Sequence, residues 1–230
     1  MNETEPIEVF TGRTVHKVIE IHSKNQINNS LDSVYSKLDD LWQYNWHKNI
    51  TPQESEEKYK NHARKCLENY YEKYGQKTYE EVQVEQKLFG KIAGETMTGI
   101  IDRLETGNHY AIIDYKTGEM PNEQYFQEDW QLALYALLII QNTKINPNSI
   151  NLQWEYIGLP KTISVTKTQK ELDDLLNAIE NKINTIKTAI KTDIFNKNVT
   201  ERCQKCEYYQ VSCDGKQSPK EQAITLNSWL

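Results

Sequence analysis

Asp114 and Lys116 stand two residues apart at the end of an apolar run within residues 111–118. The preceding Ala-Ile-Ile predicts a buried strand that ends in polar residues. Because side chains i and i+2 of a strand point to the same face, we expect Asp114 and Lys116 to project together into one site. A carboxylate there can bind a hard cation such as Mg²⁺, and a lysine can orient or deprotonate a water or stabilise charge on a phosphate.

A second carboxylate, Asp102, lies twelve residues before Asp114. Residues 99–104 are predicted to form a neighbouring strand, and the intervening Glu-Thr-Gly-Asn-His segment predicts a turn. An antiparallel hairpin through this turn would bring Asp102 beside Asp114. Two carboxylates and a lysine on adjacent strands can hold a divalent cation against a phosphodiester. Taken alone, however, an Asp-x-Lys triplet is more often a solvated ion pair at the end of a strand.

A strong helix pattern over residues 128–140 carries Gln131 and Tyr135, which lie four residues apart on one helix face. A buried polar pair needs hydrogen-bond partners, and a phosphate or a base would serve as well as a neighbouring backbone. Taken alone, the pair is more simply a core tyrosine with a glutamine at its rim.

A helix is also predicted at residues 14–23, with Thr14 as its N-cap. His16 and Glu20 share a face of this helix because they are four residues apart. Imidazole is a competent ligand for a divalent metal. A lone histidine near a helix start is more often structural. A role in metal binding is therefore indicated only if the other motifs belong to the same site.

In chain order the motifs are G-x3-H-x3-E, G-x2-D, I-x-D-Y-K-T-G and Q-x3-Y. This order resembles the RecB-type branch of the PD-(D/E)XK nucleases, which includes the nuclease domains of RecB and AddB and the CRISPR-adaptation exonucleases. The resemblance runs from His16 to Cys213, most of the chain. It implies a Mg²⁺- or Mn²⁺-dependent deoxyribonuclease that hydrolyses phosphodiester bonds in DNA repair or recombination, most simply as an exonuclease.

The resemblance also implies roles for individual residues of the first three motifs. His16, Asp102 and Asp114 would be metal ligands, and the backbone carbonyl of Tyr115 would be a further ligand. Lys116 would be the catalytic lysine, acting with the two aspartates. All of these positions hold residues with suitable chemistry, which favours an enzyme.

Three other residues would support this site by the same resemblance. Gln131 and Tyr135 would contact DNA, and Glu20 would lie near the metal shell. The implied partners are DNA and a helicase or another recombination protein. Two alternatives stay open: a DNA-binding module on the same fold with weak or no cleavage, and the nuclease part of a larger helicase–nuclease.

Cys203, Cys206 and Cys213 form a C-x2-C-x6-C pattern, and the fourth cysteine is Cys66. Closely spaced thiols in a chain without a secretory signal indicate a metal or cluster site rather than disulfides. Many members of the resembled branch carry a [4Fe–4S] cluster on four cysteines, one of them before the histidine motif. No cysteine precedes His16 here, so Cys66 would be the fourth ligand. Zinc at the same thiols, or no metal, are the alternatives.

The chain of 230 residues carries a net charge of −6, which argues against a general electrostatic grip on DNA but suits metal-binding carboxylates. Hydrophobic residues make up only 37%, although 14 Tyr and 5 Trp add buried area. The longest apolar run, residues 132–140, is too short to span a membrane, and the acidic N-terminal segment is unlike a signal peptide. We therefore expect an intracellular, cytoplasmic protein with no membrane association.

The elements that must position these residues follow from hydrophobic periodicity. We expect an α/β fold: a restriction-endonuclease-like core with a mixed central sheet flanked by helices, in a single domain over residues 1–230. A helical insertion is expected at residues 25–76 and a cysteine-containing tail at 196–230. The predicted helices cover residues 14–23, 31–48, 51–74, 128–140 and 171–195, and the predicted strands cover 79–88, 96–104, 110–115, 151–158 and 163–166.

Overall fold

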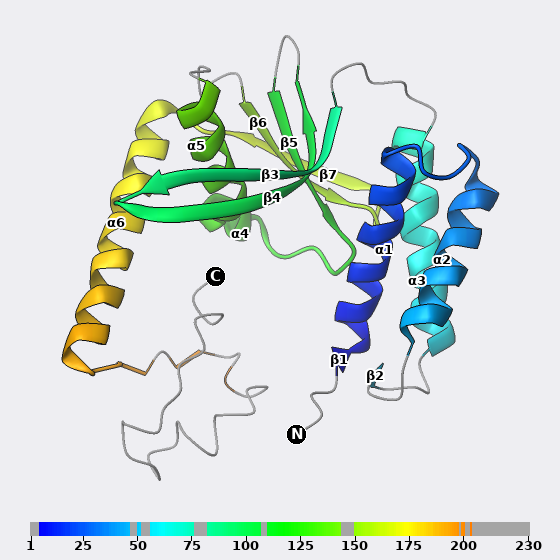
Figure 1. Cartoon of the computed structure of the whole chain (residues 1–230), viewed down its shortest axis with the longest axis horizontal. Helices are drawn as coiled ribbons and strands as arrows, with labels where there is room; N and C mark the ends of the chain where they lie inside the picture. The colour runs from blue at the N-terminus through cyan, green and yellow to red at the C-terminus, as the bar shows by residue number, and fades with distance from the viewer. Residues whose placement is uncertain are drawn as a thin grey trace. The chain divides into compact units, whose positions relative to one another are not determined.

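The structure is a computed structural model that describes residues 5–46, 50–51, 56–75, 82–106, 110–143, 150–197, 199–200 and 203. The chain divides into two compact units, residues 1–175 and 176–230. The first unit contains the whole sheet and every motif that precedes the cysteine cluster (Figure 1). The expectation of one domain with an insertion at 25–76 and a tail from residue 196 stays a prediction.

The central sheet has five strands in the order β3-β4-β5-β6-β7. β5 and β6 run parallel, whereas the other three neighbouring pairs are antiparallel. This confirms the mixed sheet and the α/β class. The strands are β3 (Val82–Ile92), β4 (Glu95–Glu105), β5 (Tyr110–Lys116), β6 (Ile150–Tyr156) and β7 (Lys161–Thr166).

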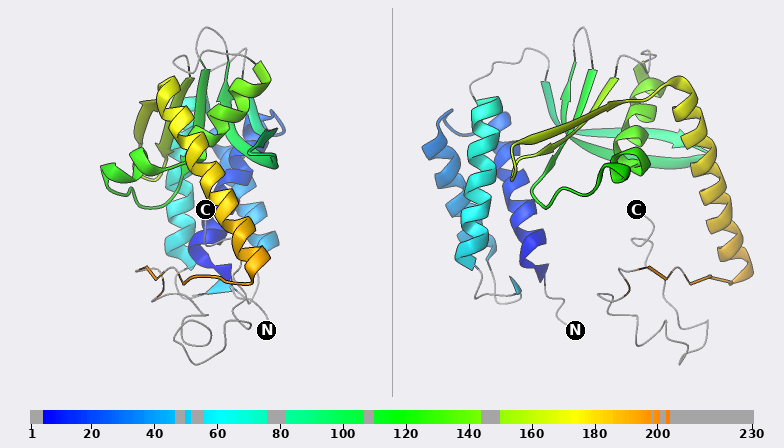
Figure 2. Two further views of the ribbon diagram at one scale, coloured as in Figure 1. Left: turned by 90° about the vertical axis from the view of Figure 1, so that its left-hand side faces the viewer. Right: turned by 180° about the vertical axis from the view of Figure 1, so that it is seen from behind.

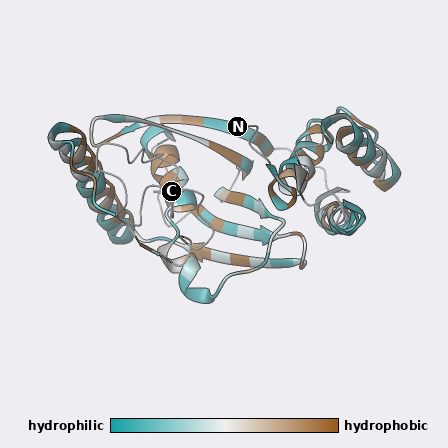
Figure 3. Ribbon diagram, turned by 90° about the horizontal axis from the view of Figure 1, so that it is seen from below, coloured by the Kyte–Doolittle hydropathy of each residue, from teal (hydrophilic) through white to brown (hydrophobic). Residues whose placement is uncertain are grey.

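β3 and β4 form a long hairpin that is joined by the two residues Ala93 and Gly94. Both have positive φ, 53° and 80°, as a tight turn matched to the strand twist requires. Hydrophobic and hydrophilic residues alternate along these strands (Figure 3). The alternation lets one face pack against a helix while the other stays open, and α5 (Gln131–Thr143) packs against β3 as well as β5 and β6.

Three helices, α1, α2 and α3, lie side by side and pack against one another (Figures 1 and 2). They are α1 (Ile7–Ser23), α2 (Leu31–Asn45) and α3 (Glu56–Tyr70), and α3 continues into a π-helical turn, η2 (Tyr71–Gly75). The remaining elements are the short parallel strands β1 (Glu5–Pro6) and β2 (Ile50–Thr51) and the helices α4 (Glu123–Glu128) and α6 (Gln169–Thr192).

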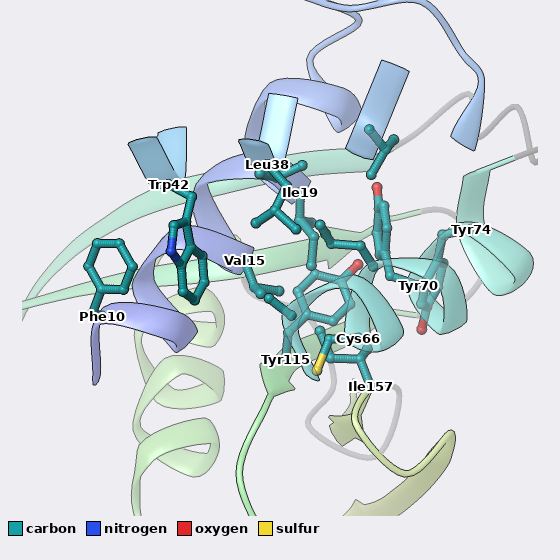
Figure 4. Close-up of a cluster of buried hydrophobic side chains, with 14 of the residues drawn as sticks. Phe10, Val15, Ile19, Leu38, Trp42, Cys66, Tyr70, Tyr74, Tyr115 and Ile157 are labelled. Atoms are coloured by element: carbon teal, nitrogen blue, oxygen red, sulfur yellow. The ribbon is translucent and has the colours of Figure 1, made fainter. Parts of the chain in front are cut away.

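The hydrophobic core around α1 is completed by the two helices of the predicted insertion (Figure 4). Phe10 of α1 meets Trp42 of α2 edge to face, with ring centroids 4.8 Å apart. Tyr115 of β5 is buried in the same cluster, where its ring packs edge-on against Tyr70 of α3. The insertion is therefore part of the core that holds the end of β5.

Several predicted boundaries are wrong: β3 runs four residues past the predicted end, α2 and α6 end three residues early, and three predicted helix starts fail for local reasons. α1 begins at Ile7, and Thr14 is no N-cap: it lies inside the helix, where its hydroxyl donates to the Phe10 carbonyl at 2.8 Å. Thr51 does not start a helix but belongs to β2, and residues 52–55 lie outside the described part. α5 starts only at Gln131, because Asp129 is extended and accepts a hydrogen bond from the Gln131 backbone N–H.

Within the described residues, no helix combines the length and the apolar character needed to cross a bilayer.

Candidate active site

The site is built on the end of β5, whose residues 111–115 are all buried. Asp114 and Lys116 project to the same side, as predicted, and Lys116 Nζ lies 2.7 Å from Asp114 Oδ2. Tyr115 between them turns its ring into the helical core. Tyr115 therefore fixes the end of the strand in the hydrophobic core, while the Asp114 carboxylate and the Lys116 ammonium both point into the site.

Asp102 on β4 reaches the same place. β4 and β5 pair antiparallel up to Arg103 and Ile113, so the predicted hairpin is confirmed. One residue beyond this last pair, Asp102 Oδ2 accepts a hydrogen bond from the Tyr115 backbone N–H at 2.8 Å. His16 on α1 approaches from the other side, with its Nδ1 3.5 Å from Asp102 Oδ1. The structure therefore brings His16, Asp102 and the Asp114–Lys116 pair together.

Burial and charge oppose each other at these groups. Burial raises the pKa of Asp114 to about 6, although the Lys116 charge favours the carboxylate. Burial disfavours the Lys116 ammonium, but the charge of Asp114 outweighs it and the pKa of Lys116 is raised. The pKa of His16 is likewise raised, because its hydrogen bond to Asp102 and the two aspartate charges outweigh burial. The Lys116 ammonium and the His16 imidazole, whose charged form is favoured, thus face the two carboxylates.

The Q-x3-Y motif continues this network from α5. Lys116 Nζ donates to Gln131 Oε1 at 3.4 Å, and Gln131 Nε2 donates to the Tyr135 hydroxyl, also at 3.4 Å. The Tyr135 ring lies over Gly99 of β4, where an added Cβ would stand 2.5 Å from a ring carbon. The glycine of G-x2-D therefore makes room for the tyrosine of Q-x3-Y. Sequence reasoning did not identify this contact.

Thr117, directly after Lys116, is held between two helices. Its carbonyl lies 2.7 Å from His62 Nε2 of α3, which fits a donated N–H. Its hydroxyl approaches Gly12 of α1 so closely that an added Cβ would stand only 3.1 Å away. Gly12 is one turn before His16, so this contact sets the distance between the two halves of the site. His62 was not predicted, and its context in the sequence contains no signal for this role.

An open groove of about 760 Å³ leads to the site. Glu20 lines it together with His16 and Asp102, and its carboxylate is ion-paired with Lys17 at 2.6 Å and Lys24 at 2.7 Å. These two lysines lower the pKa of Glu20. Glu20 therefore lines the same groove as His16 and Asp102, but its two oxygens already have cationic partners, and its place near a metal stays a prediction.

Glu85 of β3 lines the same groove and was not predicted. It is half-buried, and burial together with the charges of Asp102 and Glu20 raises the pKa of Glu85. Its segment, Val-Gln-Val-Glu-Gln, has the ordinary alternation of a strand and gives no sign of a site residue.

The sequence profile of the PD-(D/E)XK nuclease superfamily matches residues 2–214. The chain belongs to the PD-(D/E)XK nuclease superfamily. No curated protein matches this nuclease.

Among solved structures, a "Putative exonuclease" from Eubacterium rectale is similar to this nuclease, with a TM-score of 0.55 and 15% sequence identity. The match covers 100% of this chain and 81% of that one, and at this identity it supports the fold alone. A second structure, SSO0001, is 11% identical over 95% of this chain and 89% of its own, but its TM-score of 0.39 is too low to add weight.

The donors at the nuclease site suit a hard divalent cation. The side chains brought together here offer two carboxylates and one imidazole, and no thiolate. Asp114 Oδ2 is buried and accepts no well-oriented hydrogen bond from the described residues, since its contact with Lys116 is an ion pair. As arranged in the described part of the chain, no three His, Cys, Asp or Glu side chains surround one point closely enough for metal binding. Asp114 faces Lys116 instead.

The cysteines lie in different settings. Cys66 on α3 is fully buried in the helical core, and burial raises the pKa of its thiol to about 12. Cys203 is half-buried and near the Thr200 backbone, whose N–H donates to its sulfur at 3.3 Å. Cys206 and Cys213 lie outside the described residues. The role of Cys66 as a fourth ligand stays a prediction.

Proposed function

We propose that this PD-(D/E)XK nuclease is a Mg²⁺- or Mn²⁺-dependent deoxyribonuclease that acts as an exonuclease in DNA repair or recombination. One observation carries the proposal: Asp114 and Lys116 face one place from a single strand, 2.7 Å apart, with Asp102 on the adjacent strand. An acid that can bind a cation, beside a lysine that can stabilise charge on a phosphate, suits phosphodiester hydrolysis.

Asp102, Asp114, His16 and the Tyr115 carbonyl would hold the cation. When bound, it would polarise the phosphate and lower the pKa of the attacking water. Asp102 is fixed for this task by the Tyr115 N–H and by His16, so it is pre-oriented. Asp114 would supply the second carboxylate, and its Oδ2 lies 2.7 Å from the Lys116 ammonium.

Lys116 would stabilise the negative charge that develops on the phosphate. Its neighbour Asp114 favours the ammonium form, which can donate but cannot accept a proton. Gln131 holds the lysine from the opposite side and is itself held by Tyr135. We therefore favour charge stabilisation over proton abstraction among the roles that the sequence left open.

The groove has the chemistry to receive a DNA strand. Tyr44 at the end of α2 lines it and is 87% exposed, and the apolar Val9 and Ile100 line it too and are also exposed. Exposed aromatic and apolar surface can stack or cover an unpaired base. Arg13 lines the groove and offers a guanidinium to a phosphate, although Glu5 shares it at 2.9 Å.

The proposal is tested with end-labelled linear DNA and circular single-stranded DNA, each incubated with Mg²⁺, Mn²⁺ or EDTA. We expect shortening of linear DNA from an end in either metal, no cleavage of the circle, and no activity in EDTA. Asp114→Asn serves as the matched inactive variant, because it keeps the size of the side chain. Cleavage of the circle would contradict the exonuclease assignment. Binding without cleavage in any metal would favour the DNA-binding module.

We also propose that Cys203, Cys206 and Cys213 bind one metal centre, a [4Fe–4S] cluster in preference to zinc. Three thiols within eleven residues are the support, and a structural tie for the tail is the expected role. Protein purified without oxygen should absorb near 400 nm, and changing any of the three to serine should bleach it. Metal analysis that finds neither iron nor zinc would exclude the site. Activity of the purified chain alone would show whether a helicase partner is required.

A further inference from the structure

Glu85 has a backbone conformation that a strand residue rarely adopts. Its φ is +50°, in the left-handed region, although it lies inside β3. Glutamate has no intrinsic preference for this region, which glycine and asparagine enter more easily. Such strain persists only where the surrounding structure imposes it, and it concentrates at functional sites.

The strained residue lies directly across the sheet from Asp102. The strands pair Val84 with Arg103 on one side and Gln86 with Ile101 on the other, so Glu85 and Asp102 occupy opposite positions where the ladder is interrupted. Opposed like charges destabilise a sheet. Two unfavourable features therefore coincide next to a carboxylate of the proposed metal site.

In the described part of the chain, nothing donates a hydrogen bond to the Glu85 carboxylate or forms an ion pair with it, and the charges of His16 and Lys24 act on it only from farther away. Glu85 lines the same groove as His16 and Asp102. Separately, the buried Asp114 Oδ2 also lacks a well-oriented donor. Among the described residues, Asp114 Oδ2 faces only the Lys116 ammonium, at 2.7 Å, whereas the Glu85 carboxylate faces the groove without an ion-pair partner. A divalent cation in the groove would supply the positive charge that Glu85 and Asp102 face in common.

We propose that Glu85 is a third carboxylate ligand of the divalent cation site, bound directly or through a water. The left-handed backbone turns an ordinary strand residue toward the groove, and the cation offsets the repulsion between Glu85 and Asp102. This inference rests on the proposed metal-dependent nuclease function and adds a ligand that the four sequence motifs do not contain.

The test measures Mn²⁺ binding by titration calorimetry and melting temperature in EDTA and in Mn²⁺, using the full chain. Glu85→Gln removes the charge and keeps the side-chain size, and Glu85→Gly also relieves the backbone. Two controls lie on the same hairpin. Ala93→Gly relieves a φ of +53° without changing charge, and Glu95→Gln removes an acid that does not line the groove.

We expect Glu85→Gln to weaken Mn²⁺ binding about tenfold or more, with both controls unchanged. In EDTA the Glu85 variants should melt at or above the wild-type temperature, because the repulsion is gone. Should Glu85→Gln fail to fold, Glu85→Gly provides the same comparison. Unchanged Mn²⁺ affinity in a folded Glu85 variant overturns the inference.

A wild-type chain and Asp102→Asn separate this inference from the function on which it rests. If wild type binds Mn²⁺, Asp102→Asn loses binding and Glu85→Gln keeps it, only the role of Glu85 is wrong. If wild type binds no Mn²⁺ and cleaves no DNA, the proposed function is wrong and the role of Glu85 falls with it.

Discussion

Replacing Gly99 by alanine tests how the strand and helix motifs interlock. An added Cβ would lie 2.5 Å and 2.8 Å from two carbons of the Tyr135 ring, whereas ordinary contacts begin at 3.4 Å. The ring would have to move by about 0.9 Å, and overpacking of this kind costs about 1–3 kcal/mol. Alanine also recovers about 0.5–1 kcal/mol by restricting the unfolded chain. We therefore expect Gly99→Ala to lower the free energy of unfolding by about 1–2 kcal/mol.

The effect of Gly99→Ala on the free energy of unfolding should have the opposite sign when the Tyr135 ring is absent. In a Tyr135→Ala background the clash is gone, so Gly99→Ala should stabilise by about 0.5–1 kcal/mol. The coupling between the two positions is then roughly 1.5–3 kcal/mol, in the upper half of the range for residues in contact. Tyr135→Phe is the control that keeps the ring and removes only the hydroxyl that Gln131 contacts.

Urea denaturation at 25 °C of wild type, the two single variants and the double variant gives this coupling, and Gly99→Ala in the Tyr135→Phe background should still be destabilising. Nuclease activity provides a second reading, because a displaced ring releases Gln131 and through it Lys116. Additive free energies, with a coupling below about 0.5 kcal/mol, would refute the packing argument.

The remaining predictions concern the groove, the hydrogen bond from His62 to the Thr117 carbonyl (the clasp on Thr117) and the buried thiol of Cys66. Tyr44→Ala should raise KM for single-stranded DNA about 10- to 100-fold with kcat little changed, because stacking contributes about 1–3 kcal/mol per base; an unchanged KM would remove Tyr44 from the DNA path. His62→Ala should lower kcat about tenfold through loss of the hydrogen bond to Thr117, and His62→Gln should restore part of it; equal activity of both variants and wild type would contradict the clasp. With the three tail cysteines changed to serine, Cys66 should resist alkylation at pH 8 until the protein unfolds, because its pKa is about 12 and it is buried; rapid labelling of the native protein would contradict its placement.

The sequence was sufficient to predict which side chains meet at the end of β5, because the rules involved are local. Alternation along a strand put Asp114 and Lys116 on one side, and a hairpin of predictable length put Asp102 beside them. The mixed sheet followed from the same patterns of strands and helices. Helix boundaries were predicted less well. The pattern predicted Thr14 as an N-cap, but a threonine can also lie inside a helix when its hydroxyl donates to the carbonyl four residues earlier, as Thr14 does to Phe10.

Contacts between distant elements could not be predicted in this way. The glycines of G-x3-H and G-x2-D are visible in the sequence, but their reasons are the close approach of Thr117 to Gly12 and of Tyr135 to Gly99. His62 acts through a carbonyl 55 residues away, and no pattern along the chain reports such a pair. Glu85 has an unusual φ that only tertiary structure imposes. The only sign of these contacts in the sequence is a glycine at a fixed distance from a site residue, namely Gly12 before His16 and Gly99 before Asp102.

The central claim is that Lys116 stabilises charge during phosphodiester hydrolysis, and its most direct test is kcat/KM of Lys116→Met on end-labelled linear DNA in Mn²⁺. Lys161→Met, an exposed lysine at the start of β7, is the matched control. We expect Lys116→Met to lose a factor on the order of 10²–10³, with Mn²⁺ affinity and melting temperature retained, and Lys161→Met to behave as wild type. Wild-type kcat/KM in folded, metal-binding Lys116→Met would contradict the account.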